Sequence, residues 1–219
     1  MGETRILIVD DHPLFRAALK ESIAGGIAKA SIEQTGSLDA ARAFLDADDN
    51  FDLVLLDLRM PGVQGLSGLI YLRAQYPNVP VVIVTAAEDH GLVQKALNLG
   101  ASGFIPKTSG IDTIVEAVNT VLQGDVWAPE ETAGQSPADK ESDDIARRIA
   151  TLTAQQIRVL MMLKEGLLNK QIAYELGVSE ATVKAHVSAV LMKLGVESRT
   201  QAVIALGRLG LAPGEELAD

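Results

Sequence analysis

Two patterns of hydrophobic residues alternate along the first 124 positions. Short apolar runs rich in β-branched residues are separated by stretches in which apolar residues recur every three or four positions. The runs lie at 5–11, 31–36, 51–57, 79–85 and 102–107. Such short apolar runs are typical of strands buried on both faces of a parallel sheet, with helices between them. The pattern predicts an α/β domain built from five βα units.

The pattern changes after residue 124. Residues 125–150 contain Pro, Gly, Ser and many acidic residues with almost no apolar periodicity, which predicts a linker. From residue 151 onward only helical spacing remains, and Thr153 with Gln156 and Ser198 with Gln201 match the capping-box pattern of a helix start. We expect four helices, near 154–164, 169–176, 180–194 and 199–209. The expected parts are a first domain at 1–124, an acidic linker at 125–150, an all-α domain at 151–212 and an acidic tail at 213–219.

Composition narrows the possible chemistry. The 219-residue chain has no cysteine and three scattered histidines, so thiol chemistry and a histidine-based metal site are not expected. No apolar run approaches the roughly 18 residues that a membrane helix needs. The N-terminus becomes acidic after four apolar positions, unlike a secretion signal. We expect a cytoplasmic protein with no membrane partner.

Polar residues follow four of the expected strands directly: Asp10 and Asp11, Asp57, Thr85 and Lys107. In doubly wound parallel sheets, ligands bind at the carboxyl ends of the strands, where these residues would meet. Clustered carboxylates repel one another unless a cation lies between them, and oxygen ligands suit Mg²⁺. The set predicts a site where a carboxylate attacks phosphorus while Mg²⁺ and a lysine neutralise the phosphoryl oxygens. Taken singly, each acid also fits a turn or a helix cap.

Four motifs, ILIVDD, LVLLDLRMPG, VVIVTA and GFIPK, resemble those of bacterial response-regulator receiver domains. The resemblance covers about residues 4–122 and implies a flavodoxin-like, five-stranded doubly wound parallel sheet. It also implies that Asp57 is the phosphoacceptor and that Mg²⁺ is held by Asp10, Asp11, Asp57 and the backbone carbonyl of Arg59.

The resemblance assigns three further roles. Lys107 is expected to contact the phosphoryl group, and Thr85 to move toward a phosphoryl oxygen on activation. Phe104 is expected to follow inward as an aromatic switch, although it equally fits a core residue of the last strand.

The segment around LGVSEATVKAHV resembles the LuxR-type helix-turn-helix domain of the NarL/FixJ subfamily of response regulators, over about residues 152–209. The resemblance implies that helix 169–176 crosses the DNA backbone and that helix 180–194 enters the major groove. The face of this helix opposite its valine stripe carries small residues without Arg, Asn or Gln, so base selectivity should be modest. The expected DNA contacts are Thr182, Lys184, Ala185, Ser188, Lys170 and Lys193.

The net charge of −10 is unevenly distributed. Residues 1–124 carry nine basic and fifteen acidic side chains, and residues 125–150 carry three and seven. Residues 151–212 carry seven basic against four acidic side chains. Because this segment has few cations, it can make only few contacts with DNA phosphates. A monomer should therefore bind DNA weakly, and affinity should depend on pairing of two protomers. The acids at 139–144 are a candidate to cover the basic face.

These observations predict a DNA-binding transcription factor of a two-component system rather than an enzyme. A histidine kinase would phosphorylate Asp57, and a homodimer would bind promoter DNA when phosphorylated or DNA-bound. A phosphohydrolase is disfavoured because Arg59 occupies the position of its second aspartate. Two alternatives remain open: a receiver that signals through protein contacts without phosphate, and a helical domain that binds a protein instead of DNA.

Overall fold

The computed structural model describes residues 3–48, 50–61, 63, 65–86, 90–129 and 137–211. The chain divides into two compact units, Met1–Gly134 and Gln135–Asp219. None of the described helices combines the length and the apolar character that crossing a membrane requires.

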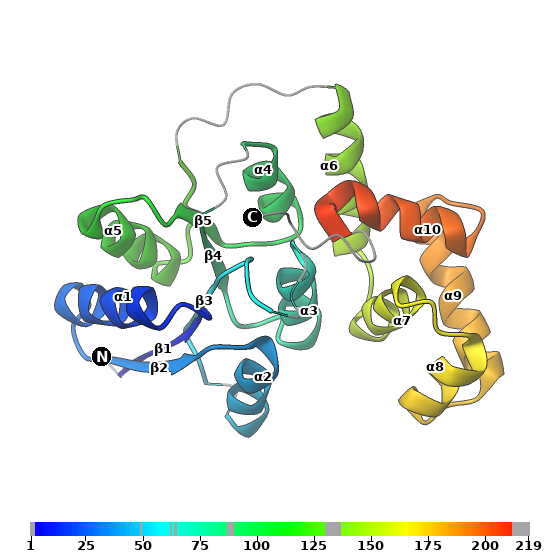
Figure 1. Ribbon diagram of the computed structural model, residues 1–219, viewed down its shortest axis with the longest axis horizontal. Helices are drawn as coiled ribbons and strands as arrows, with labels where there is room; N and C mark the ends of the chain where they lie inside the picture. Colours follow the sequence, from blue (N-terminus) through cyan, green and yellow to red (C-terminus); the bar gives the residue numbers. More distant parts are fainter. Residues whose placement is uncertain are drawn as a thin grey trace. The chain divides into compact units, whose positions relative to one another are not determined.

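The described part of the first unit is a parallel sheet covered by helices (Figure 1). Its strands are β1 (Thr4–Val9), β2 (Ala30–Thr35), β3 (Leu53–Leu56), β4 (Val81–Thr85) and β5 (Gly103–Pro106), and they lie in the order β2-β1-β3-β4-β5. The helices are α1 (Pro13–Gly26), α2 (Leu38–Ala47), α3 (Ser67–Gln75), α4 (His90–Asn98) and α5 (Ile111–Leu122). The chain moves outward from β1 in both directions, so the prediction of a five-stranded doubly wound parallel sheet is confirmed.

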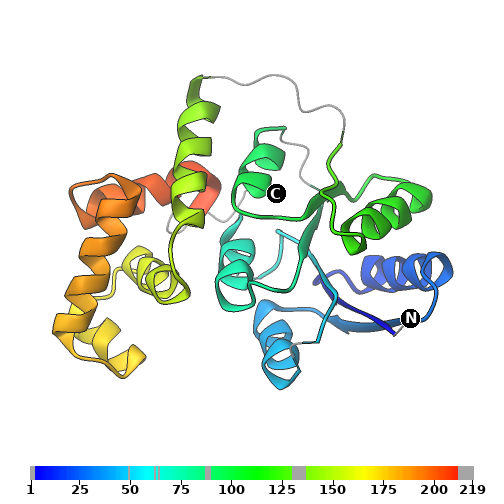
Figure 2. The same ribbon diagram turned by 180° about the vertical axis from the view of Figure 1, so that it is seen from behind.

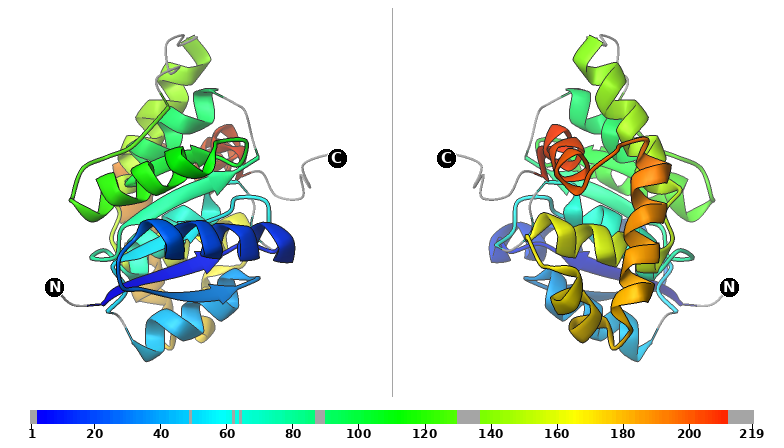
Figure 3. Two further views of the ribbon diagram at one scale, coloured as in Figure 1. Left: turned by 90° about the vertical axis from the view of Figure 1, so that its left-hand side faces the viewer. Right: turned by 90° about the vertical axis from the view of Figure 1, so that its right-hand side faces the viewer.

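Both faces of the sheet are buried, which explains its continuous apolar runs. Successive residues of a strand point to opposite faces, yet Ile6, Leu7, Ile8 and Val9 are all fully buried. Ile6 and Ile8 pack in one cluster with residues of α1 and α5. These two helices lie side by side over that face (Figure 3, left), while α2, α3 and α4 cover the other (Figure 2). A polar residue inside such a strand would lose its hydration, so polar groups collect at the strand ends.

The described part of the second unit is helical. Its helices are α6 (Pro137–Ala150), α7 (Ala154–Lys164), α8 (Asn169–Leu176), α9 (Glu180–Leu194) and α10 (Arg199–Leu206), followed by a π-helical turn, η1 (Gly207–Leu211). Figure 3 (right) shows α9 in orange beside α7 and α8 in yellow. Four predicted helices are therefore present, and the last of them changes to the wider π-helical winding at Gly207.

Hydrogen bonds at the helix ends agree closely with the sequence signals. The Thr153 hydroxyl accepts from the Gln156 backbone N–H at 3.3 Å, and the Gln156 side chain accepts from the Thr153 N–H at 3.0 Å, which confirms this capping box. The Ser198 hydroxyl likewise accepts from the Gln201 N–H at 3.2 Å. The Gln201 side chain, however, reaches the N–H of Glu197 at 2.7 Å, one residue before the predicted partner.

The prediction that residues 125–150 form a linker is wrong for its described parts. Trp127 forms a parallel bridge with Gly103, and its carbonyl accepts a hydrogen bond from the Phe104 N–H at 3.0 Å. Residues 137–150 form helix α6, which packs against α9, α10 and η1. Its buried stripe runs through Ser142, Ile145, Ala146 and Ile149. Only two members of that stripe are strongly apolar, so the helical period was hidden in the sequence.

The acids of this segment also have partners inside the second unit. Glu141 pairs with Arg208, and Asp144 pairs with Arg148 at 2.8 Å. Asp143 is 3% exposed. Glu141 therefore connects α6 to η1, whereas the pair of Asp144 with Arg148 lies within α6 itself. The expectation that the acids at 139–144 cover the basic face stays a prediction.

Candidate functional site

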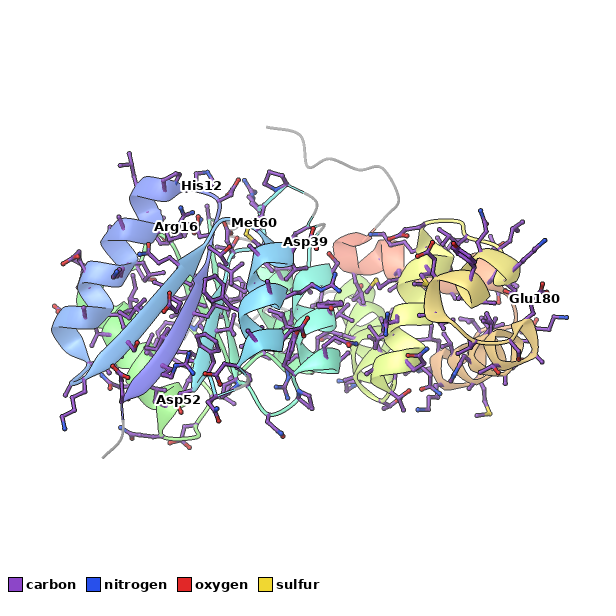
Figure 4. All side chains as sticks on the ribbon, turned by 90° about the horizontal axis from the view of Figure 1, so that it is seen from below. His12, Arg16, Asp39, Asp52, Met60 and Glu180 are labelled. Carbon is purple, nitrogen blue, oxygen red and sulfur yellow. The ribbon has the colours of Figure 1, made fainter. Side chains whose placement is uncertain are left out.

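The carboxyl ends of the parallel strands bring the predicted residues together. Backbone bonds that continue the sheet ladder hold each of them: Asp10 N–H to Thr35 O at 3.0 Å, Asp57 N–H to Val9 O at 2.9 Å, and Lys107 N–H to Thr85 O at 2.8 Å. Each side chain therefore starts one residue beyond its strand, at the same edge of the sheet. Figure 4 shows His12 and Met60 at this end and Asp52 at the opposite end.

A lysine lies between two buried carboxylates at this edge. Lys107 Nζ is 2.6 Å from Asp57 Oδ2 and 2.7 Å from Asp10 Oδ2. The exposed fractions of Asp57 and Asp10 are 1% and 2%, so their charges are almost entirely removed from water. Burial raises the pKa of the Asp57 carboxyl, and the hydrogen bonds from Lys107 and from the Arg59 N–H oppose that rise. The ammonium therefore helps to keep Asp57 in the anionic form that a nucleophile requires.

The acidic group fits a divalent cation. Asp10, Asp11, His12 and Asp57 each offer a ligand atom, and these atoms lie within 4.8 Å of one another. Among the described residues, the buried atoms Asp10 Oδ2 and Asp11 Oδ1 have no hydrogen-bond partner. Their close neighbours are the Lys107 ammonium and the His12 imidazole, respectively. Carboxylate oxygens of this kind suit Mg²⁺. The Arg59 N–H donates to Asp57 Oδ1 at 3.1 Å, which places the Arg59 peptide beside the group.

Sequence reasoning missed three neighbours of this site. His12 Nδ1 lies 2.8 Å from Asp11 Oδ1, although the histidines looked scattered in the sequence. The Lys107 ammonium lies 4.6 Å from the centre of the Phe15 ring, and Arg16 donates to the Asp10 carbonyl. The position of His12 directly after two aspartates was the available signal, whereas Phe15 and Arg16 meet the site only because α1 begins there.

The two predicted switch residues are buried. Thr85 ends β4 at the same edge and is 0% exposed. Phe104 lies in β5 with 1% of its surface exposed, so in this conformation it is a core residue. The expected roles of both side chains in switching stay predictions.

A second group of predicted residues lies on α9 and α8. Val183, Val190 and Leu194 are buried, whereas Thr182, Lys184, Ala185 and Ser188 are exposed on α9. Lys170 is exposed on α8. Lys193 is different, because its ammonium donates to Thr151 O at 2.8 Å and to Gln156 Oε1 at 2.9 Å. The structure gathers five of the six predicted DNA contacts on exposed positions and gives the sixth partners within the unit.

Comparison with known proteins assigns both units. Residues 6–119 match the model of the response regulator receiver domain, and residues 150–206 match that of the bacterial regulatory proteins of the luxR family. The chain belongs to the LuxR-type response regulators of the NarL/FixJ kind. This response regulator is accordingly a DNA-binding transcription regulator of a two-component system.

Curated relatives match nearly the whole response regulator, and solved structures match either the larger part or nearly all of it. It is 42% identical over 209 residues to the glycerol metabolism activator of Pseudomonas putida, covering 93% of this chain and 95% of that protein. The nitrate/nitrite response regulator NarP of Escherichia coli is 33% identical over 203 residues, covering 91% and 93%. A LuxR family DNA-binding response regulator from Silicibacter pomeroyi matches with 35% identity and a TM-score of 0.53, covering 58% of this chain and 98% of that one. RcsB from Salmonella enterica serovar Typhimurium, bound to promoter P1flhDC in the presence of BeF₃⁻, shares the fold at 21% identity and a TM-score of 0.56, covering 95% and 100%.

Proposed function

We propose that a histidine kinase phosphorylates Asp57 and that this modification changes self-association and thereby promoter binding in the cytoplasm. The position of Lys107 Nζ, 2.6 Å from Asp57 and 2.7 Å from Asp10, is the observation that carries the proposal. A lysine between two buried carboxylates adds little to the free energy of unfolding, because the desolvation of the three charged groups offsets most of their attraction. The same arrangement suits the transfer of a phosphoryl group, which brings negative charge to the site.

The proposed reaction is a displacement at phosphorus. A carboxylate oxygen of Asp57 bonds to phosphorus, the bond from phosphorus to the donor histidine nitrogen breaks, and an acyl phosphate forms on Asp57. The Lys107 ammonium passes from the carboxylates to a phosphoryl oxygen, and the Arg59 N–H holds Asp57 Oδ1 in place. Asp10, Asp11, Asp57 and the backbone carbonyl of Arg59 would hold Mg²⁺, which when bound neutralises charge on the phosphoryl oxygens.

The proposed switch begins with the charge that the new group adds. A phosphoryl group brings about −1.5 to −2 charge at neutral pH. Thr85, at the end of β4, would move to bind a phosphoryl oxygen. Phe104 in β5 would then change its packing to fill the space that Thr85 leaves. Self-association of the first unit would change as a consequence.

The proposed DNA interface is the exposed face of α9 with Lys184 as its main cation. Thr182, Ala185 and Ser188 would meet base edges, and Lys170 would meet a phosphate from α8. Lys193 contacts DNA only if it leaves its two acceptors. Arg199 and Arg208 also donate within the unit, to Leu167 O at 2.6 Å and to Glu141, which further limits the cations available to phosphates. Pairing of two protomers as a homodimer doubles the available contacts.

Phosphorylation of Asp57 can be tested with a small labelled phosphodonor and Mg²⁺. Wild-type protein should incorporate label, and Asp57→Ala should not. Asp39→Ala is a matched control, because the Asp39 side chain is 93% exposed at the start of α2. Equal labelling of wild type and Asp57→Ala would refute the proposed phosphoacceptor.

Two further measurements separate the remaining alternatives. If phosphorylated and unphosphorylated protein bind DNA equally well, the receiver that signals without phosphate is favoured. Unchanged DNA binding after Lys184→Ala with Ala185→Glu would contradict α9 as the reading helix.

A further inference from the structure

The C-terminal end of α9 is held by a residue outside the helix-turn-helix segment. Arg148, in the last turn of α6, donates from Nη1 to the carbonyl oxygen of Leu194, the last residue of α9, at 2.8 Å. Its Nη2 is 2.8 Å from Asp144 Oδ2, one turn earlier on α6. One guanidinium therefore joins a carboxylate of α6 to the end of α9. The planar group fixes the angle between those two acceptors.

The end of α9 leaves this carbonyl free for Arg148. The N–H of Gly195 binds Met192 O at 3.1 Å, and the N–H of Val196 binds Leu191 O at 3.0 Å. These bonds satisfy carbonyls one turn inside the helix, as helix-ending glycine motifs do. The Leu194 carbonyl, at the negative end of the helix dipole, receives the cation.

Gly195 is required at this position for two reasons. Its φ of 67° lies in the left-handed region, which side chains rarely adopt. A Cβ added there would also lie 2.1 Å from Arg148 Nη1, so the guanidinium would have to move away from the helix end. The space beside the helix end is thus occupied by the guanidinium itself.

Helix α6, which carries Arg148, is itself held in the unit by further contacts. Ser142 Oγ donates to Arg208 O at 3.3 Å, and Glu141 pairs with the Arg208 side chain. Ile145, Ala146 and Ile149 are buried along the same helix. The start of α9, in turn, is held by its own cap, where the Ser179 hydroxyl accepts from the Thr182 N–H at 3.1 Å. Helix α9 is therefore fixed at its start by a local cap and at its end by α6.

We propose that Arg148 is a positioning residue for DNA reading: oriented by Asp144, it binds the last carbonyl of α9 and sets the direction of that helix. This inference rests on the proposed role of α9 as the reading helix. Helix α6 is then a working part of the DNA-binding unit rather than a connector. Because base-edge contacts depend on the helix direction much more than phosphate contacts do, Arg148 controls selectivity for sequence.

The chain offers a matched control in the neighbouring residue. Arg147 lies on the same turn, is exposed, and makes no hydrogen bond or ion pair with any described residue. Arg147→Met and Arg148→Met remove the same charge from the same helix. Any difference between them reports the contacts of Arg148 with Leu194 and Asp144 and not the loss of a cation.

The test uses the full-length protein and two DNA probes: a duplex enriched from a random pool by the wild type, and a scrambled duplex of the same composition. For Arg148→Met we expect about tenfold weaker binding to the enriched duplex, comparable to the loss of one hydrogen bond from a charged donor. Binding to the scrambled duplex should match that of Arg147→Met. Arg148→Lys should recover part of the loss. Equal effects of the two Met variants on both probes, or no effect of either, would overturn the inference.

Two additional variants keep the test decisive. Thermal unfolding of each variant defines a temperature at which all are folded, and Asp144→Asn replaces Arg148→Met if the latter does not fold. Asp144→Asn should weaken binding to the enriched duplex by about threefold, and combined with Arg148→Met it should add little, since both act on one contact. Full additivity would count against positioning. The double variant Lys184→Ala with Ala185→Glu tests the proposed function separately. If it loses DNA binding, α9 reads DNA; if it keeps DNA binding, the proposed function itself has failed, and not this inference alone.

Discussion

Replacement of Lys107 by methionine should make the stability of the first unit depend steeply on pH. The substitution keeps most of the side-chain volume and removes the ammonium that lies 2.6 Å from Asp57 and 2.7 Å from Asp10. Two almost fully buried carboxylates then face each other without the lysine, and the His12 imidazole nitrogen, 3.4 Å from Asp10 and 3.9 Å from Asp57, is the neighbour that remains. Burial already raises the pKa of Asp57, and the loss of the lysine raises it further.

The magnitude follows from the cost of taking up a proton. Removing one partner of a buried ion pair costs about 3–5 kcal/mol. The folded variant can take up a proton on Asp57 and so remove the buried charge. The loss in free energy of unfolding therefore cannot exceed the free energy of protonating a carboxyl whose ordinary pKa is 3.8. At 1.36 kcal/mol for each pH unit, that limit is about 4 kcal/mol at pH 7 and about 2 kcal/mol at pH 5. A carboxyl with a raised folded-state pKa loses stability as pH rises above its unfolded value, so Lys107→Met should be closest to wild type at low pH.

Urea unfolding in EDTA measures the effect directly. Trp127 is the single tryptophan, and its backbone is bound to β5, so its fluorescence reports the first unit. The free energy of unfolding of Lys107→Met should fall relative to wild type between pH 5 and pH 7. Added Mg²⁺ should restore more stability to the variant than to wild type, because a cation bound only by the folded state stabilises it. A difference from wild type that is constant across this pH range would refute the reasoning.

Three further substitutions test the helical unit and the core. Gly195→Ala should destabilise the second unit by about 2 kcal/mol or more, because the new Cβ displaces Arg148 from the Leu194 carbonyl in addition to causing roughly 1–2 kcal/mol of left-handed strain. Gly166→Ala, with a φ of 83° and nothing near its Cβ, should show the strain alone in the same thermal unfolding experiment. Thr153→Ala should cost about 1 kcal/mol through loss of the α7 capping box, seen as a lower melting temperature by circular dichroism. Ile8→Ala should cost about 2–5 kcal/mol in urea unfolding, since Ile8 on β1 is fully buried and packs with residues of α1 and α5. A smaller loss would mean that the surrounding residues close around the cavity.

The strands and the site were readable from the sequence for one physical reason. A strand buried on both faces has to be apolar throughout, so the first polar residue after each run marks the edge of the sheet. Asp57 and Lys107 are separated by 50 positions, yet both follow such runs, and parallel pairing alone brings them to the same edge. Local caps were equally legible, because Thr153 and Gln156 interact across a single turn.

The sequence alone determined the fold of the first unit, the convergence of its carboxylates and lysine, and the exposed face of α9, because each depends on local periodicity or on regular strand pairing. Only the tertiary structure decided which charges are free. Lys193, Glu141 and Arg148 look like surface charges in the sequence, but each is bound to a residue more than 35 positions away. Such contacts depend on how helices pack, and no pattern within a single helix encodes them. For the same reason α6 appeared as a linker: its stripe of Ser142, Ile145, Ala146 and Ile149 becomes a core face only when α9, α10 and η1 lie against it.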